Sequence, residues 1–119
     1  MTTGRLTTHA LDTAHGRAAA GMKIEFSVLE GAAWTLFKTV VTNADGRTDE
    51  PLLAGDAMRA GRYQLLFHVA DYFRCIGVNL PDPPFIDRVP LHFGIADAHA
   101  HYHVPLLCSP WAYSTYRGS

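Results

Sequence analysis

Residues 101–108 alternate between two kinds of side chain, and this alternation is the strongest constraint on how the chain can fold. In an extended strand, successive side chains point to opposite faces of the sheet. One face of this strand carries two imidazoles, on His101 and His103. The apolar face consists of Tyr102, Val104, Leu106 and Cys108. The pattern therefore predicts a half-buried strand with a histidine-bearing outer face.

Short segments with the same alternation recur along the whole chain. Strands are predicted at residues 5–11, 23–29, 34–42, 62–70, 89–95 and 112–116, with one more short strand within 51–61. Turn-forming residues separate them, above all Asn43-Ala44-Asp45-Gly46 and the three prolines of residues 79–84. One short helix is predicted at 72–76, with Asp71 as its N-cap and Gly77 after its end. The pattern predicts an all-β fold, an antiparallel β-sandwich.

Composition limits the size of the fold and the kinds of partner. A chain of 119 residues with 48% hydrophobic residues is predicted to form one domain, residues 1–119, that buries roughly two-thirds of its unfolded surface. The net charge of -1, without a basic block, argues against binding to nucleic acid or to an anionic membrane. No apolar stretch approaches the ~20 residues of a membrane span, and no apolar signal segment opens the chain. We expect a cytoplasmic protein with free, buried thiols at Cys75 and Cys108.

Seven histidines are the unusual feature of the composition, because histidine alone titrates near neutrality when it is unperturbed. His9 lies on the face of the first predicted strand opposite Leu6, and Arg47 follows directly after a turn. Taken singly, each fits an ordinary solvent-exposed side chain, as do His68 and His92.

The spacing of His99, His101 and His103 leaves a metal site open as an alternative. Alternate residues of a strand share a face, and imidazole is a good zinc ligand. Such spacing also arises by chance, and the chain has no cysteine pair with zinc spacing. We therefore predict no metal and no cofactor, with His99 exposed to solvent.

Three segments, taken together and in order, resemble the 5-hydroxyisourate hydrolases, the transthyretin-related enzymes of purine catabolism. They are residues 6–12, the turn Asp45-Gly46-Arg47, and the ending formed by residues 101–107 and 113–119. The final Tyr116-Arg117-Gly118-Ser119 is the most specific part, because it matches a family signature. Transthyretin itself lacks this ending, and it carries other residues where the enzymes have His, Arg and His.

The resemblance implies a transthyretin-like sandwich of two four-stranded sheets with one short helix. It also implies a homotetramer, a dimer of dimers, whose active sites line a channel between the dimers. The implied reaction is hydrolysis of 5-hydroxyisourate to 2-oxo-4-hydroxy-4-carboxy-5-ureidoimidazoline, a step of urate degradation. By motif, the residues essential to the family fall on His9, Arg47, His103 and the C-terminal four, Tyr116, Arg117, Gly118 and Ser119.

These residue types suit the opening of a ring by water. Attack of water on an acyl carbon needs a base, and the developing oxyanion needs positive charge or hydrogen-bond donors. Neutral histidine is a suitable base at neutral pH, and Arg47 offers a permanently charged fork of donors. The residues leave open which histidine is the base. We favour His103, with His9 as its partner.

Ser114 and Tyr116 are predicted to add hydrogen bonds to the substrate. Strand parity places them on the histidine-bearing face if Tyr113 and Thr115 pack inward. The C-terminal residues are accordingly expected to form part of the active-site wall.

Two other functions stay open from the sequence. A binding module would hold a hydrophobic, hormone-like ligand in the same channel, as transthyretin does, but it has no need of a base. A metal-buffering protein would instead use the clustered histidines.

Overall fold

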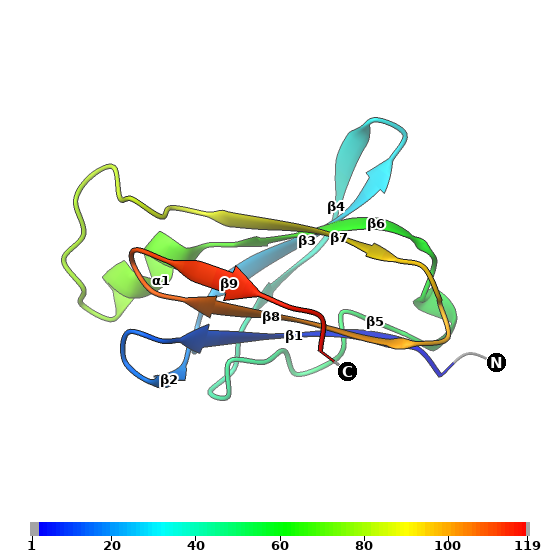
Figure 1. Ribbon diagram of the computed structural model, residues 1–119, viewed down its shortest axis with the longest axis horizontal. Helices are drawn as coiled ribbons and strands as arrows, with labels where there is room; N and C mark the ends of the chain where they lie inside the picture. The colour runs from blue at the N-terminus through cyan, green and yellow to red at the C-terminus, as the bar shows by residue number, and fades with distance from the viewer. Residues whose placement is uncertain (1–2, 119) are drawn as a thin grey trace.

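The strand of residues 101–108 lies at the centre of one sheet, beside the first strand of the chain (Figure 1). The structure is a computed structural model that describes residues 3–118. β1 (Arg5–Asp12) and β8 (His101–Cys108) pair in parallel along their whole length. The other edge of β8 takes β9 (Tyr113–Thr115). The other edge of β1 takes two short strands, β5 (Leu53–Ala54) at its start and β2 (Arg17–Ala18) at its end.

The second sheet packs against the first and has the strand order β4–β3–β6–β7 (Figure 1). Its strands, all antiparallel, are β3 (Lys23–Glu30), β4 (Ala33–Val41), β6 (Gly61–Phe67) and β7 (Val89–Ile95). The pairing register of β3 with β4 shifts between Phe26 and Ser27, and the hairpin tip projects from the sandwich. The predicted sandwich is confirmed, with one parallel pair, β1–β8, in an otherwise antiparallel arrangement. The first sheet has five strands instead of the four expected, because β2 and β5 both pair with the same edge of β1.

The core lies between the two sheets and is built from alternate residues, as the period-two patterns predict. The predicted apolar face of residues 101–108 is buried, with no side chain more than 8% exposed. The largest fully buried side chains come from both sheets and include Leu6, Ile24, Phe26, Leu65, Phe67 and Leu106. The polar face of β1 and β8 therefore points out of the sandwich, and a site built on it opens away from the core.

The helix starts earlier than the sequence predicts. The strand predicted at 62–70 ends at Phe67, and α1 (Val69–Cys75) begins two residues later. Asp71 lies inside the helix, and the N-cap position falls to His68. The residues that α1 buries have the i, i+1, i+3, i+4 spacing of a helical stripe: Val69, Ala70, Tyr72 and Phe73. The start of the helix cannot be read from the sequence, because Val69 continues the alternation of apolar residues that predicts a strand. A short 3₁₀ turn, Gly55–Ala57, follows β5.

Two predictions about exposure are wrong. His68, predicted on the surface, is 5% exposed, because the turn from β6 into α1 carries its ring inward to a Glu25 carboxylate oxygen 2.6 Å from Nε2. Cys75, predicted buried, is exposed at the end of α1. Cys108 is buried as predicted, and burial raises the pKa of its thiol to about 12. Both thiols are free.

Within residues 3–118, none of the helices has the length and apolar character needed to cross a membrane.

Candidate active site

The parallel register of β1 and β8 brings together histidines from the two ends of the chain. Thr7 lies opposite His103, and His9 lies opposite Pro105, one pair further along. Because both histidines are on the outward face, their rings are neighbours, with centroids 6.3 Å apart and planes tilted by 46°. The structure therefore confirms that His9 and His103 share one face of the sheet.

A turn at residues 43–47 carries Arg47 onto this face. The backbone N–H of Ala10 donates to the Gly46 carbonyl at 2.8 Å, and His9 and Arg47 form an isolated β-bridge. Gly46 has a φ of +75°, and a Cβ at this position would lie 2.3 Å from the Ala10 carbonyl oxygen. Only glycine permits so close an approach. In the Asp45-Gly46-Arg47 motif, the glycine thus allows the turn to approach β1 closely enough to bring Arg47 beside it.

Asn43 holds the turn in shape. Its Oδ1 accepts hydrogen bonds from the backbone N–H groups of Asp45, at 2.9 Å, and of Arg47, at 3.1 Å. Its own backbone N–H donates to the Arg47 carbonyl at 2.8 Å. Asparagine commonly orders turns in this way. The sequence predicts the turn, but it does not reveal that one side chain fixes the approach of Arg47.

The hydrogen bond of His9 assigns its tautomer. His9 Nε2 lies 2.8 Å from the Asp45 carbonyl oxygen. A carbonyl only accepts, so Nε2 carries the hydrogen and donates. In the neutral ring, Nδ1 of His9 then keeps a free lone pair. The turn that delivers Arg47 therefore also orients His9.

His103 is held at one ring nitrogen and surrounded by positive charge. Its Nδ1 lies 2.8 Å from Thr7 Oγ1, and the side chain is partly buried. Burial first, and then the charges of Arg47 and His9, lower the pKa of His103 below its ordinary value. The ring is therefore uncharged at neutral pH, in the state in which an imidazole accepts a proton.

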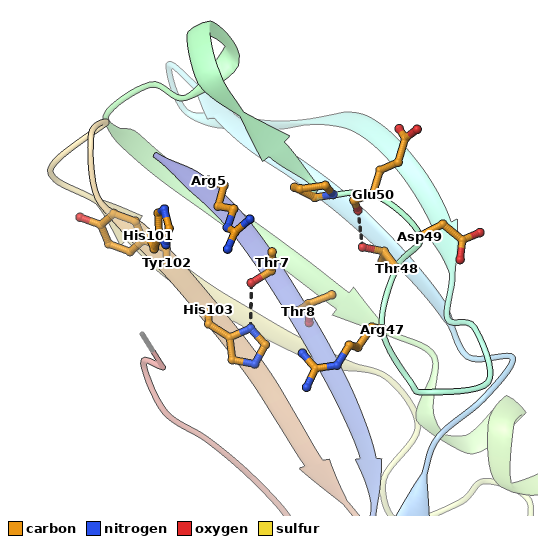
Figure 2. A pocket seen from close by; sticks show the side chains of 11 residues that line it. Arg5, Thr7, Thr8, Arg47, Thr48, Asp49, Glu50, His101, Tyr102 and His103 are labelled. Atoms are coloured by element: carbon orange, nitrogen blue, oxygen red, sulfur yellow. Dashed lines mark hydrogen bonds between the residues drawn. The ribbon is translucent and has the colours of Figure 1, made fainter. Parts of the chain in front are cut away.

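A cavity of about 470 Å³ opens beside His103 (Figure 2). Its basic and hydroxyl-bearing walls include Arg5, Thr7, Arg47 and His101. Asp49 and Glu50 belong to its rim, but Figure 2 shows their carboxylates pointing away from His103. Between residues 3 and 118, neither arginine of the cavity has an ion-pair partner within 4 Å. The cavity therefore presents unneutralised cationic donors to a ligand.

Residues 117 and 118 run antiparallel beside β8, next to this cavity, and Gly118 forms a β-bridge with His103. The backbone N–H of Gly118 donates to the His103 carbonyl at 2.7 Å. Arg117 donates through Nη2 to the His101 carbonyl at 3.1 Å, and its guanidinium lies 4.2 Å from the centre of the Tyr102 ring. Residues 117 and 118 are thus fixed by their own contacts. Ser119, the last residue of the signature, lies outside the described residues.

Two predicted substrate-binding residues, Ser114 and Tyr116, do not line the cavity beside His103 within one chain. Ser114 pairs with Leu107, so it shares the sheet face of His103 but lies four strand residues away, about 13 Å. Tyr116 is 59% exposed and lines an adjoining hollow with His101. The expectation that Tyr113 and Thr115 pack inward is wrong, because β9 is exposed throughout as an edge strand.

The three histidines of residues 99–103 do not converge. His99 is exposed in the connection before β8, so the strand alternation does not extend to it. His101 bonds the Thr3 carbonyl through Nε2 at 3.0 Å. In the described chain, residues 3–118, no three His, Cys, Asp or Glu side chains are grouped as metal ligands would be.

Sequence reasoning missed Thr7, Arg5 and Asn43 as parts of the site. For Arg5 and Thr7 a signal existed, because they precede His9 at intervals of two and must share its strand face. Their closeness to His103 follows only from the pairing of β1 with β8.

Comparison with known proteins identifies the family of the chain. Residues 6–118 match the model of the HIUase/Transthyretin family. A protein of Rhizobium meliloti (strain 1021) named 5-hydroxyisourate hydrolase 2 is 63% identical over 98% of this chain and 97% of its own length. The crystal structure of (S)-allantoin synthase superposes with a TM-score of 0.93 at 43% identity, over 99% of this chain. This chain spans only 44% of that protein.

Transthyretin itself is also a structural neighbour. Sea bream transthyretin, solved in complex with thyroxine, has a TM-score of 0.85 at 28% identity and covers 96% of this chain, which covers 94% of it. The family match spans almost the whole described chain, and the relatives share both its sequence and its fold. The chain belongs to the HIUase/Transthyretin family.

Proposed function

We propose that this chain is a hydrolase that opens the ring of 5-hydroxyisourate. The observation that carries the proposal is the meeting of three side chains on one sheet face: His103 and Arg47 line the same cavity, and the ring of His9 neighbours that of His103 at 6.3 Å between centroids. Burial and the nearby charges lower the pKa of His103, which leaves it available as a base beside a fixed cation. The Rhizobium relative named for this activity, 63% identical, supports the choice of substrate.

In the proposed reaction, His103 removes a proton from water as the water oxygen bonds to an acyl carbon of the substrate. The bond from that carbon to the ring nitrogen then breaks, and the nitrogen takes up the proton from His103. One water is consumed, and the acyl carbon becomes a carboxylic acid, which ionises at neutral pH. The product is 2-oxo-4-hydroxy-4-carboxy-5-ureidoimidazoline. A neutral histidine with a lowered pKa suits both transfers.

Arg47 has two effects in this scheme. Its guanidinium, charged at every physiological pH, donates hydrogen bonds to the oxyanion that forms on the attacked carbon. The same charge keeps His103 unprotonated and so available as a base. His9, oriented by the Asp45 carbonyl, presents its Nδ1 lone pair next to His103 and positions the attacking water.

We further propose that the site is completed in a homotetramer, a dimer of dimers. The cavity faces outward from β1 and β8, and Ser114 and Tyr116 stand on the same exposed side without reaching it. Apposed copies of this sheet would bring them to a neighbouring cavity. Light scattering at assay concentration tests this, and a fully active monomer would contradict it.

A second candidate is a non-catalytic binding protein, favoured by the structural likeness to transthyretin in complex with thyroxine. Against it, a hydrophobic ligand gains nothing from two unpaired arginines beside a pair of histidines. The uricase-coupled assay separates the two. Uricase generates 5-hydroxyisourate from urate, and the decay of its absorbance is followed with and without the protein. A hydrolase accelerates the decay catalytically, whereas a binding protein does not.

A further inference from the structure

We propose that Thr7 is a positioning residue that fixes the tautomer of His103: its hydroxyl accepts the Nδ1–H hydrogen bond and leaves Nε2 as the proton acceptor. The catalytic meaning of this inference rests on the proposed function, but the tautomer itself does not.

The contact follows from the register of two strands. Thr7 and His103 are directly opposite each other in the parallel β1–β8 pair, and both side chains point outward. Thr7 Oγ1 and His103 Nδ1 are 2.8 Å apart, a short hydrogen bond that Figure 2 marks with a dashed line. On the opposite face of β1, the Thr8 hydroxyl donates to the Val104 carbonyl at 2.8 Å and links the two strands at the next pair of residues.

A hydroxyl either donates or accepts, so the distance alone does not place the proton. The surroundings of the other ring nitrogen, Nε2, show which nitrogen carries the proton. Figure 2 shows the free nitrogen of His103 turned toward the Arg47 guanidinium. A guanidinium is only a donor and is always charged, so it attracts a lone pair at Nε2 and repels an N–H there. The proton therefore sits on Nδ1, and Thr7 is the acceptor.

The charged and titratable groups around His103 do not change this assignment. They come from both strands, from the turn and its following segment, and from the chain end: Arg5, His9, Arg47, Asp49, Glu50, His101 and Arg117. The two carboxylates, the only anions in this set, point away from the ring. Neither competes with Thr7 for the Nδ1 proton.

The direction of this hydrogen bond determines how its loss changes the pH dependence. A bond from Nδ1–H to Oγ1 exists in the neutral ring and strengthens in the imidazolium, so it favours protonation. Its removal lowers the pKa of His103. A bond in the opposite sense exists only in the neutral ring, and its removal raises that pKa. The sign of the shift therefore reports which atom donates.

The experiment compares Thr7→Val with Thr7→Ser and with the adjacent Thr8→Val. Thr7→Val removes the acceptor at nearly constant volume, Thr7→Ser retains it, and Thr8→Val removes a buried hydroxyl that does not touch His103. ¹⁵N NMR of protein labelled with ¹⁵N-histidine measures the tautomer and the pKa of His103 without substrate. The resonances of His103 are assigned as those missing from the spectrum of His103→Asn. The acid limb of kcat/KM against pH reads the same group in catalysis.

We expect wild type and Thr7→Ser to show His103 protonated at Nδ1. In Thr7→Val the resonances should become those of a tautomer mixture, the pKa should fall by about half a unit to one unit, and kcat should fall about 10- to 100-fold with little change in KM. Thr8→Val should melt at a lower temperature but keep the wild-type tautomer and pH profile.

Three results would overturn the inference: a wild-type ring protonated at Nε2, a rise in the pKa of His103 in Thr7→Val, or an unchanged spectrum in that variant. A protein without activity on 5-hydroxyisourate that still shows the Thr7-dependent tautomer would refute the proposed function and leave this inference standing.

Discussion

Gly118 lies directly against His103: its backbone N–H donates to the His103 carbonyl at 2.7 Å, and a Cβ added to it would lie 2.8 Å from the imidazole Cδ2. The glycine of the C-terminal signature is thus explained by contact with the proposed base. No side chain fits between the chain end and the ring.

The first prediction concerns this contact. Gly118→Ala must displace either the ring or the chain end, because the clash is with rigid atoms of an imidazole already held by Thr7. We expect turnover to fall about 10- to 100-fold, with the melting temperature almost unchanged because the residue is outside the core. Gly94→Ala is the matched control, since its Cβ would meet only the Gly61 carbonyl at 3.8 Å. Wild-type turnover in Gly118→Ala would show that the contact does not position His103.

The second prediction concerns pH. A base is active when unprotonated, so activity is lost as the pH falls through the pKa of His103, which burial, Arg47 and His9 lower. The acid limb of kcat/KM in the wild type should therefore lie below pH ~6.5, the ordinary value for histidine. Arg47→Gln removes one of the charges that lower the pKa of His103. The acid limb of kcat/KM measured on the residual activity of this variant should therefore move to higher pH. A limb that stays in place or moves down would show that Arg47 does not act on the base.

The third prediction concerns a buried carboxylate far from the site. Asp12 is fully buried at its side chain and accepts hydrogen bonds from the Tyr72 hydroxyl at 2.8 Å and from His15 at 2.7 and 3.0 Å. Burial raises the pKa of Asp12, but these hydrogen bonds outweigh it and lower the pKa overall. Burial and the contact with Asp12 raise the pKa of Tyr72 to about 12, so its hydroxyl remains a donor.

Tyr72→Phe should therefore lower the free energy of unfolding by about 1.5–3 kcal/mol at pH 7 without changing turnover. A carboxyl with a lowered folded-state pKa stabilises the fold above its unfolded pKa, and this stability is lost as the pH falls through the folded value. The difference between the wild type and Tyr72→Phe should accordingly shrink in acid. Tyr63→Phe, which loses a bond to the neutral Arg59 carbonyl, should show a smaller and pH-independent loss. Denaturant unfolding at neutral and acid pH measures both, and equal effects in the two variants would contradict the account.

The fourth prediction concerns metals. The proposed reaction uses a histidine base and an arginine, so dialysis against a chelator should leave turnover unchanged. Metal analysis of the purified protein accompanies the assay. Activity that disappears with the chelator and returns with zinc would refute a metal-independent mechanism.

Much of the fold follows from local pattern. The alternation of residues 101–108 predicts both the buried face and the outward His103, because a strand allows only two directions for a side chain. The turn before Arg47 is equally local, since Asn43 and Gly46 have the chemistry that a turn requires.

What the sequence does not predict depends on pairing between distant segments. The contact of Thr7 with His103 exists only because β1 and β8 run parallel in one register, and a shift by one residue would face Thr8 outward instead. His68 is buried because the chain turns into α1 at that point. The sequence does not reveal this turn, because the apolar residues there fit the spacing of a strand as well as that of a helix. Ser114 shares the predicted face, but parity does not give its distance along the strand from His103.

The rate of 5-hydroxyisourate decay in the uricase-coupled assay, compared among wild type, His103→Ala and His99→Ala, tests the central claim most directly. His99 is the matched control, because it is an exposed histidine outside the cavity, four residues earlier in the chain. The account predicts that wild type and His99→Ala accelerate the decay equally. His103→Ala should be slower by about two to four orders of magnitude while keeping its fold. A wild-type protein that leaves the decay unchanged, or a His103→Ala variant that matches it, would contradict the account.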